Sequence, residues 1–197
     1  MKKLLRIDTS TRKNDSHSRD LANRYEKKWK EKNSDNVIIN RDLSETKLPH
    51  LTQPFIEAMF TPKEERDTSM NETLRDSKIL IDELKSADTI LLSLPMYNFG
   101  IPSSLKAYID HITRVGETFT MDENGFTGLI TGKKLVIFSA YGAVFDEMKQ
   151  MDFVEPYLKS LFGFLGFTDI EYYAIEGTSM LDNEVLDDKK EVLSRLF

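Results

Sequence analysis

Apolar residues follow two patterns along this chain: short continuous runs, and longer segments in which they recur every three or four positions. The short runs predict five buried strands, at residues 4–7, 37–39, 89–94, 135–138 and 170–175. The longer segments predict helices over residues 21–29, 70–84, 105–112, 154–165 and 189–197. Because the strands alternate with helices, the pattern indicates a parallel sheet that is covered on both faces.

These elements predict one α/β domain over residues 1–197, with a doubly wound, flavodoxin-like sheet of five parallel strands in the order 2-1-3-4-5. Residues 44–70 are an exception, because they hold three prolines and show regular apolar spacing only at 55–60. We expect this segment to be an irregular arm or lid near an interface. Turn-forming residues at 122–125 and 131–132 predict an irregular stretch or a hairpin before the fourth strand.

Composition argues against several classes of function. The chain has no cysteine, which removes disulfides, thiolate catalysis and cysteine metal sites. Its histidines, His17, His50 and His111, lack the spacing of metal ligands, so we expect no metal and read His50 and His111 as surface or capping residues. The net charge of −6 disfavours nucleic acid and anionic membranes as partners. No stretch resembles a membrane span or a signal peptide, so we expect a cytoplasmic protein.

The loop after the first strand has the chemistry of an anion site. It runs from Asp8 to Ser18 and ends where the first helix begins, so unpaired N–H groups and the helix dipole favour an anion there. Ser10, Ser16 and Ser18 offer hydroxyl groups to a phosphate monoester, His17 offers a further donor, and Arg12 supplies a cation. The alternative is a capped helix behind a solvated loop.

Two further loops fall at the same end of the sheet. Residues 93–100, with the sequence SLPMYNFG, combine a proline, an amide side chain and aromatic rings that would grip a flat polar ring. In residues 139–142, Gly142 lets the backbone approach such a ring, and Tyr141 would stack on it or wall it off. Since three loops face one crevice, a flavin-like cofactor is the first hypothesis. The first turn lacks a G-x-G-x-x-G fingerprint, so a nicotinamide would visit as a substrate.

Most of the aromatic side chains are expected in the core. Phe60, Phe99 and Phe119 are the better candidates for a pocket that takes a planar substrate, because each belongs to an irregular segment. The paired carboxylates at 122–123 and 187–188 are read as solvated turns, so no acid and base pair is expected.

The combination of these segments resembles the FMN-dependent NADH azoreductases, a bacterial group within the flavodoxin-like quinone reductases. The resemblance extends over nearly the whole chain and is carried by the serine loop, P-M-Y-N-F at 95–99, and the segments 128–134, 156–166 and 176–177. One departure lies at 140–142, where the sequence is Ala-Tyr-Gly and the family commonly has a pair of glycines. The added bulk would reshape the substrate side of the pocket or alter the preference for a nicotinamide.

The resemblance implies a bound FMN in each subunit. It implies that Ser10, Ser16, His17 and Ser18 hold the phosphate, that Pro95, Met96, Tyr97, Asn98 and Phe99 embrace the ring, and that Ser139, Ala140, Tyr141 and Gly142 cover its other edge. It also implies a homodimer with two FMN sites at the dimer interface. The arm at 44–70 would lie near that interface, and Phe60 would reach the flavin of the partner subunit.

The activity implied is a ping-pong transfer of hydride from NADH through FMN to quinones and azo compounds, which are small planar acceptors. The flavin carries the chemistry, so no catalytic side chain is expected. One alternative is an FMN-binding electron-transfer module that does not turn over NADH, and another is an α/β domain that has lost its ligand. The physiological acceptor and the choice between NADH and NADPH stay open at this point.

Overall fold

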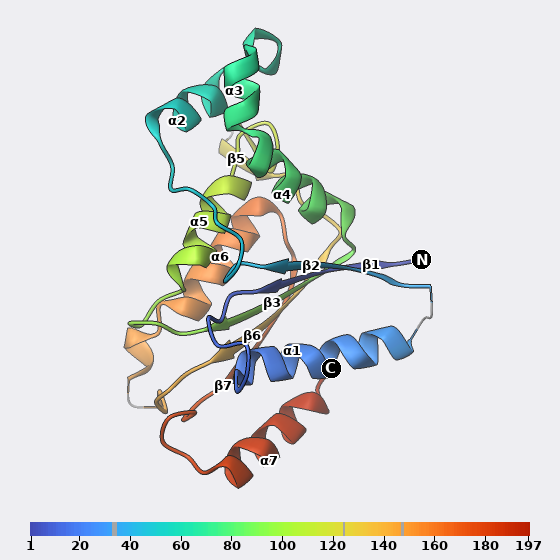
Figure 1. Ribbon diagram of the computed structural model, residues 1–197, viewed down its shortest axis with the longest axis vertical. Coiled ribbons are helices and arrows are strands. Elements are labelled where there is room, and N and C mark those ends of the chain that lie inside the picture. The colour runs from blue at the N-terminus through green and yellow to red at the C-terminus, as the bar shows by residue number, and fades with distance from the viewer. Residues whose placement is uncertain (33–34, 124, 147) are drawn as a thin grey trace.

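The computed structural model describes residues 1–32, 35–123, 125–146 and 148–197. Its centre is a five-stranded parallel sheet in the order β2-β1-β3-β6-β7 (Figure 1). The strands are β1 (Lys3–Asp8), β2 (Val37–Asp42), β3 (Thr89–Pro95), β6 (Lys134–Ala140) and β7 (Asp169–Ile175). The predicted order 2-1-3-4-5 counted only strands of this sheet. In chain order it reads 2-1-3-6-7, because a separate hairpin supplies β4 and β5.

The side chains of the sheet alternate between two apolar layers. Leu4, Leu91, Val136 and Phe138 belong to the layer beneath α1 (His17–Glu31) and α7 (Asn183–Ser194). Leu5, Ile7, Ile90, Leu92 and Ile137 belong to the layer beneath α4 (Arg75–Ser86), α5 (Ser103–Ile112) and α6 (Val154–Leu165). Figure 1 shows these two groups of helices on opposite faces of the sheet. The central strands are buried on both faces, which is why they appear in the sequence as continuous apolar runs.

The helices follow the predicted stripes with two differences. The stripe expected over 70–84 is split into α3 (Thr68–Thr73) and α4, which meet at Leu74. The last helix begins at Asn183, six residues before the predicted start, because its first turns carry few apolar residues. None of the helices in the described ranges is long and apolar enough to cross a membrane.

The segment 44–70 is more regular than predicted. It contains α2 (Gln53–Phe60), a 3₁₀ turn η1 (Lys63–Glu65) and the start of α3, and it extends beyond the sheet at the top of Figure 1. Its own small core contains Phe55. His111 ties the segment to α5, since Nε2 lies 2.9 Å from the carbonyl oxygen of Pro49 and the ring lies 4.9 Å from that of Phe55. His111 is fully buried, so its reading as a surface residue was wrong.

The predicted hairpin is formed by β4 (Phe119–Asp122) and β5 (Gly125–Gly128); residue 124 of its turn lies outside the described residues. The hairpin packs against α6, with the Phe119 ring 4.8 Å from the ring of Phe164. Gly128 is required at this contact, because a Cβ atom there would lie 2.2 Å from the backbone nitrogen of Gly166.

Candidate functional site

The loops that follow β1, β3, β6 and β7 enclose a pocket of about 140 Å³ at the carboxyl end of the sheet. This is the edge where ligands bind in doubly wound folds. The pocket is lined by Ser10, Arg12, Asp15, Ser16, His17, Ser18, Pro95, Met96, Tyr97, Ala140, Gly142, Thr178 and Ser179. Most of the site residues predicted from the sequence are therefore brought together. The exceptions among the predicted cofactor-binding residues are Asn98, Phe99, Ser139 and Tyr141, and two residues of the predicted substrate pocket, Phe60 and Phe119, also lie outside this lining.

The first wall of the pocket is the N-terminus of α1. Ser16 is the N-cap, and its Oγ accepts from the N–H of Arg19 at 3.5 Å and lies 3.4 Å from the Oγ of Ser18. Across the loop, the Oγ of Ser10 accepts from the N–H of Arg12 at 3.2 Å. N–H groups in the first turn of a helix have no partner within the helix, so they are available to a ligand. Together with the hydroxyls, they form a site suited to a phosphate group.

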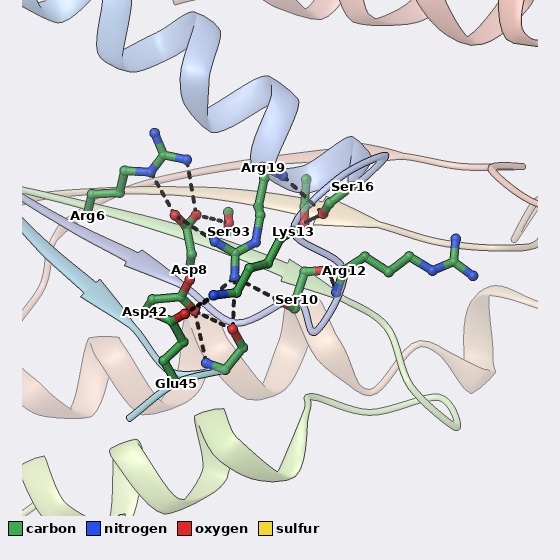
Figure 2. A network of polar contacts seen from close by, with 12 residues as sticks. Arg6, Asp8, Ser10, Arg12, Lys13, Ser16, Arg19, Asp42, Glu45 and Ser93 are labelled. Atoms are coloured by element: carbon green, nitrogen blue, oxygen red, sulfur yellow. Dashed lines mark hydrogen bonds and ion pairs between the residues drawn. The ribbon is translucent and has the colours of Figure 1, made fainter. Parts of the chain in front are cut away.

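A network of charged groups braces this loop from behind (Figure 2). Arg19 donates to the carbonyl oxygen of Ser10 at 2.7 Å and to Oδ1 of Asp42 at 2.8 Å, and it lies 3.3 Å from Oδ2 of Asp8. Asp8 also accepts from Nε of Arg6 at 2.9 Å and from Oγ of Ser93 at 2.5 Å. The guanidinium of Arg19 is thus matched by carboxylates, and its function here is to hold the loop.

The carboxyl group of Asp42 is strongly acidic in the fold. Burial raises its pKa, but the hydrogen bonds from Arg19 and Ser44 outweigh burial and lower the pKa to about 2. The sequence-based prediction missed this brace. Its signal is that β1 and β2 both end in aspartate, at paired positions of neighbouring parallel strands. Two adjacent carboxylates require a cation between them, and Arg19 occupies that place.

The loop after β3 is held by a backbone hydrogen bond where it leaves the strand, and the backbone at its tip is strained. The N–H of Met96 donates to the carbonyl oxygen of Ala140 at 2.9 Å. Tyr97 and Gly100 exchange backbone hydrogen bonds of 2.9 and 3.0 Å, which leaves Asn98 and Phe99 as a two-residue turn. Both turn residues have positive φ, 50° and 66°. Such a conformation costs about 1–3 kcal/mol in a residue such as phenylalanine and persists only where the surroundings enforce it.

In the loop after β6, alternate residues face opposite ways. Ala140 and Gly142 line the pocket, whereas Ser139 and Tyr141 are buried on the other side of the sheet. The hydroxyl of Tyr141 donates to Oδ2 of Asp152 at 2.9 Å. Burial raises the pKa of Tyr141, and the neighbouring hydroxyl of Tyr172 raises it further. The Tyr141 side chain, which was predicted to stack on a ring in the pocket or to wall it off, instead lies in the core, because the alternation of the strand directs it there.

The chain is similar to known proteins in both sequence and fold. Residues 2–196 match a protein family described as having a flavodoxin-like fold. The chain belongs to this flavodoxin-like family. It is 45% identical over 186 residues to an FMN-dependent NADH:quinone oxidoreductase of Hydrogenovibrio crunogenus, which covers 93% of this chain and 91% of the relative. It is 42% identical over 182 residues to a protein of the same name from Herminiimonas arsenicoxydans, with 91% and 89% covered.

Two solved azoreductase structures superpose on the whole chain. An azoreductase from Bacillus anthracis str. Sterne has a TM-score of 0.91 and 25% identity, and covers 100% of this chain and 98% of that one. An FMN-dependent NADH-azoreductase from Bacillus anthracis str. Ames Ancestor, in complex with FMN, has a TM-score of 0.86 and 27% identity, with 100% and 99% covered. The resemblance drawn from the sequence is confirmed.

The loop after β7, which also lines the pocket, was not predicted from the sequence. The N–H groups of Thr178 and Ser179 donate to the carbonyl oxygens of Tyr141 and Gly142 at 2.9 and 3.0 Å, which joins the last two loops side by side. The signal was present: Gly177, Thr178 and Ser179 are small or polar residues directly after a predicted strand. Loops after the first, third and fourth strands of the sheet meet at this edge, and the loop after the fifth parallel strand meets them there for the same reason.

The aromatic residues predicted to line a substrate pocket are not together within one chain. Phe99 lies on the strained turn and is 41% exposed. Phe119 packs in the β4–β5 hairpin, and Phe60 is 67% exposed at the end of α2, where it lines a separate hollow of about 240 Å³ with Arg66 and Gly116. A single subunit therefore does not assemble the three rings around one ligand.

A larger polar hollow of about 540 Å³ adjoins the pocket at the serine loop and lies between α1 and α7. His17 lies where the two hollows meet, and Lys190 lies at the far side. Burial lowers the pKa of His17, and the charge of Lys190 lowers it further, so the imidazole is neutral at pH 7 and offers one N–H donor. Within the described ranges, no three His, Asp or Glu side chains are grouped to hold a metal ion.

Proposed function

We propose that this protein is an FMN-dependent NADH:quinone oxidoreductase that also reduces azo compounds. The observation that supports the proposal is the pocket itself. It joins the serine loop to Pro95, Met96 and Tyr97 at the carboxyl end of the sheet, in a chain 45% identical to a relative of that name. The fold relatives include an azoreductase in complex with FMN.

The residues of the pocket fit FMN. The hydroxyls of Ser10, Ser16 and Ser18 and the first-turn N–H groups of α1 would hold the phosphate, with Arg12 as the nearby cation. The apolar wall of Pro95 to Tyr97 and the backbone of Ala140 to Gly142 would hold the ring. We assign Asn98 and Phe99 to the same ring-binding loop.

FMN, when bound, accepts hydride from NADH and passes two electrons to the acceptor. The contribution of the chain is to bind, orient and exclude water. Backbone N–H groups around Asn98 and Gly142 would stabilise negative charge beside the ring, through dipoles that are already oriented. NADH and a planar quinone or azo compound would use one slot in turn, which gives ping-pong kinetics.

The pocket of a single subunit is too small to enclose a whole FMN, which supports a homodimer. Its volume of about 140 Å³ is well below the roughly 300 Å³ at which pockets begin to enclose a whole ligand of this size. Beside it, Tyr97 and Phe99 are about two-fifths exposed, and Phe153, whose N–H bonds to Phe99, is 61% exposed. Exposed aromatic groups of this kind mark interaction surfaces. We propose that a second subunit covers them and that Phe60 of the arm reaches the flavin of that subunit.

Two measurements test the proposal. Apoprotein is titrated with FMN while flavin fluorescence is followed, and the loaded protein is then assayed with NADH or NADPH against one quinone and one azo dye. We expect one FMN per subunit and parallel lines in double-reciprocal plots. Absence of FMN binding would overturn the proposal, and FMN binding without NADH oxidation would favour an electron-transfer module instead.

A further inference from the structure

The side chain of Tyr141 points away from the pocket and into the core, where its hydroxyl forms hydrogen bonds. We propose that Tyr141 and Asp152 are a positioning pair, which holds the Asn98–Phe99 turn in place from the opposite side of the sheet. The inference rests on the proposed FMN site and adds residues that do not touch the ligand.

The first link is between Tyr141 and Asp152. The Tyr141 hydroxyl is 2.9 Å from Oδ2 of Asp152 and 2.5 Å from the hydroxyl of Tyr172, which in turn donates to Oγ of Ser139 at 2.8 Å. The backbone of Tyr141 is also fully used, because its N–H donates to Ile175 and its carbonyl oxygen accepts from Thr178. Tyr141 is therefore a fixed point between the two pocket-lining residues of its loop.

The second link joins this fixed point to α6. The other carboxylate oxygen of Asp152, Oδ1, accepts from the N–H groups of Val154 and Glu155 at 2.8 and 3.3 Å. One carboxylate thus bonds Tyr141 with one oxygen and the first turn of α6 with the other. These charge-assisted hydrogen bonds to Asp152, which are stronger than neutral ones, set the position of that first turn relative to β6.

The third link reaches the strained turn. Phe153 stands between Asp152 and Val154, and its N–H donates to the carbonyl oxygen of Phe99 at 3.3 Å. Asn98 and Phe99 both have positive φ, a conformation that relaxes unless it is held. The chain of contacts therefore runs from the Tyr141 hydroxyl through Asp152 and Phe153 to the tip of the loop that carries Met96 and Tyr97 into the pocket.

Removal of the Tyr141 hydroxyl leaves Oδ2 of Asp152 without its donor and frees the start of α6 to shift. The turn at Phe99 then samples unstrained conformations, and the ring wall of the pocket is no longer preorganised. Preorganisation lost in this way appears as weaker binding. A role confined to stability would instead lower the melting temperature and leave the affinity of the folded protein for FMN unchanged.

The test compares Tyr141→Phe with Tyr108→Phe. Both tyrosines are fully buried, but the hydroxyl of Tyr108 has no hydrogen-bond partner among the described residues. Apoproteins are titrated with FMN by fluorescence at a temperature where urea curves show each variant fully folded. We expect the dissociation constant to rise about 5-fold in Tyr141→Phe, to change less than about 2-fold in Tyr108→Phe, and the visible circular dichroism of bound FMN to change only in Tyr141→Phe.

A second pair of variants tests the last link directly. Phe153→Pro removes the N–H that bonds Phe99, and Phe153→Ala keeps it. Because Phe153 has φ −97°, beyond the range of about −65 ± 15° that proline adopts, both variants are compared at a temperature where urea curves show each of them fully folded. We expect Phe153→Pro to weaken FMN binding several-fold more than Phe153→Ala. Wild-type affinity in both Tyr141→Phe and Phe153→Pro would overturn the inference and leave the proposed function standing. Failure of the wild-type protein to bind FMN would overturn both.

Discussion

The pairing of Asp42 with Arg19 behind the serine loop stabilises the fold by an amount that depends on pH. Asp42→Asn removes the negative charge that faces Arg19 and preserves the shape of the side chain. In the native protein, Asp42 accepts from Arg19 at 2.8 Å and from the N–H and Oγ of Ser44 at 2.9 and 2.7 Å. An amide oxygen can still accept from Ser44, so the change isolates the contribution of the charge.

The pKa of Asp42 sets the size of the effect and its pH dependence. The pKa falls from its ordinary 3.8 to about 2 in the fold. At about 1.4 kcal/mol per pKa unit, this corresponds to roughly 2.5 kcal/mol at most. The side chain is 25% exposed, so solvent screening reduces the expected value to about 1–1.5 kcal/mol. Because the pKa is lower in the folded state, this stabilisation is fully present above about pH 4 and is lost as the pH falls towards 2.

Urea unfolding of the wild-type protein and Asp42→Asn at pH 7, 5 and 3 tests this reasoning. We expect the variant to be less stable by about 1–1.5 kcal/mol at pH 7 and 5, and the difference to shrink at pH 3. Glu45→Gln is the matched control, because Glu45 pairs with Lys13 at the surface, with both side chains more than half exposed, and should change stability by less than about 0.5 kcal/mol. An equal loss at pH 7 and pH 3, or an equal loss in the control, would refute the argument.

Three further changes have definite expected outcomes. Gly128→Ala should cost about 3 kcal/mol or more in urea unfolding, because its Cβ would meet the backbone of Gly166 at 2.2 Å; Gly163→Ala, with nothing within 4 Å, should be neutral or up to about 1 kcal/mol stabilising. Ser10→Ala should weaken FMN binding about 3- to 10-fold by fluorescence titration, and an unchanged affinity would remove the hydroxyl from the phosphate site. Phe60→Ala, at a position 67% exposed, should leave FMN affinity unchanged and lower kcat/KM for the quinone; an unchanged kcat/KM would exclude Phe60 from the acceptor site.

The parts of the fold that the sequence predicted are those in which burial alone dictates the pattern. The strands appear as continuous apolar runs because both faces of the parallel sheet are covered, and α6 appears as a stripe that ends at Gly166, a residue in the left-handed conformation. The start of α7 was missed because its first turns carry few apolar residues, and α2 was missed because its apolar spacing at 55–60 is too short to identify a helix by periodicity. His111 was misread because a histidine buried by Pro49 and Phe55 carries no local signal of burial.

For the site, the sequence predicted which loops converge but not how they are held. Loops after parallel strands meet at one edge whatever their composition, so the serine loop and Pro95 to Tyr97 could be assigned from strand order alone. The brace of Arg19 between Asp8 and Asp42 depends on groups up to 34 residues apart in the chain. Such pairings follow from the register of the sheet, which local patterns do not specify.

Tyr141 shows how strand alternation decides a question of specificity. In β6, Leu135, Ile137 and Ser139 face the layer beneath α4, α5 and α6, and Tyr141 continues that series, whereas Ala140 faces the pocket. The family resemblance leads to a pair of glycines at this loop, where this chain has the larger Tyr141. The Tyr141 side chain enters the core and therefore does not fill the pocket. What the tyrosine adds is an anchor, through Asp152, for a loop that glycines would leave freer. A substitution that looks like a change of pocket shape in the sequence is, in the fold, a change in how firmly the pocket is held.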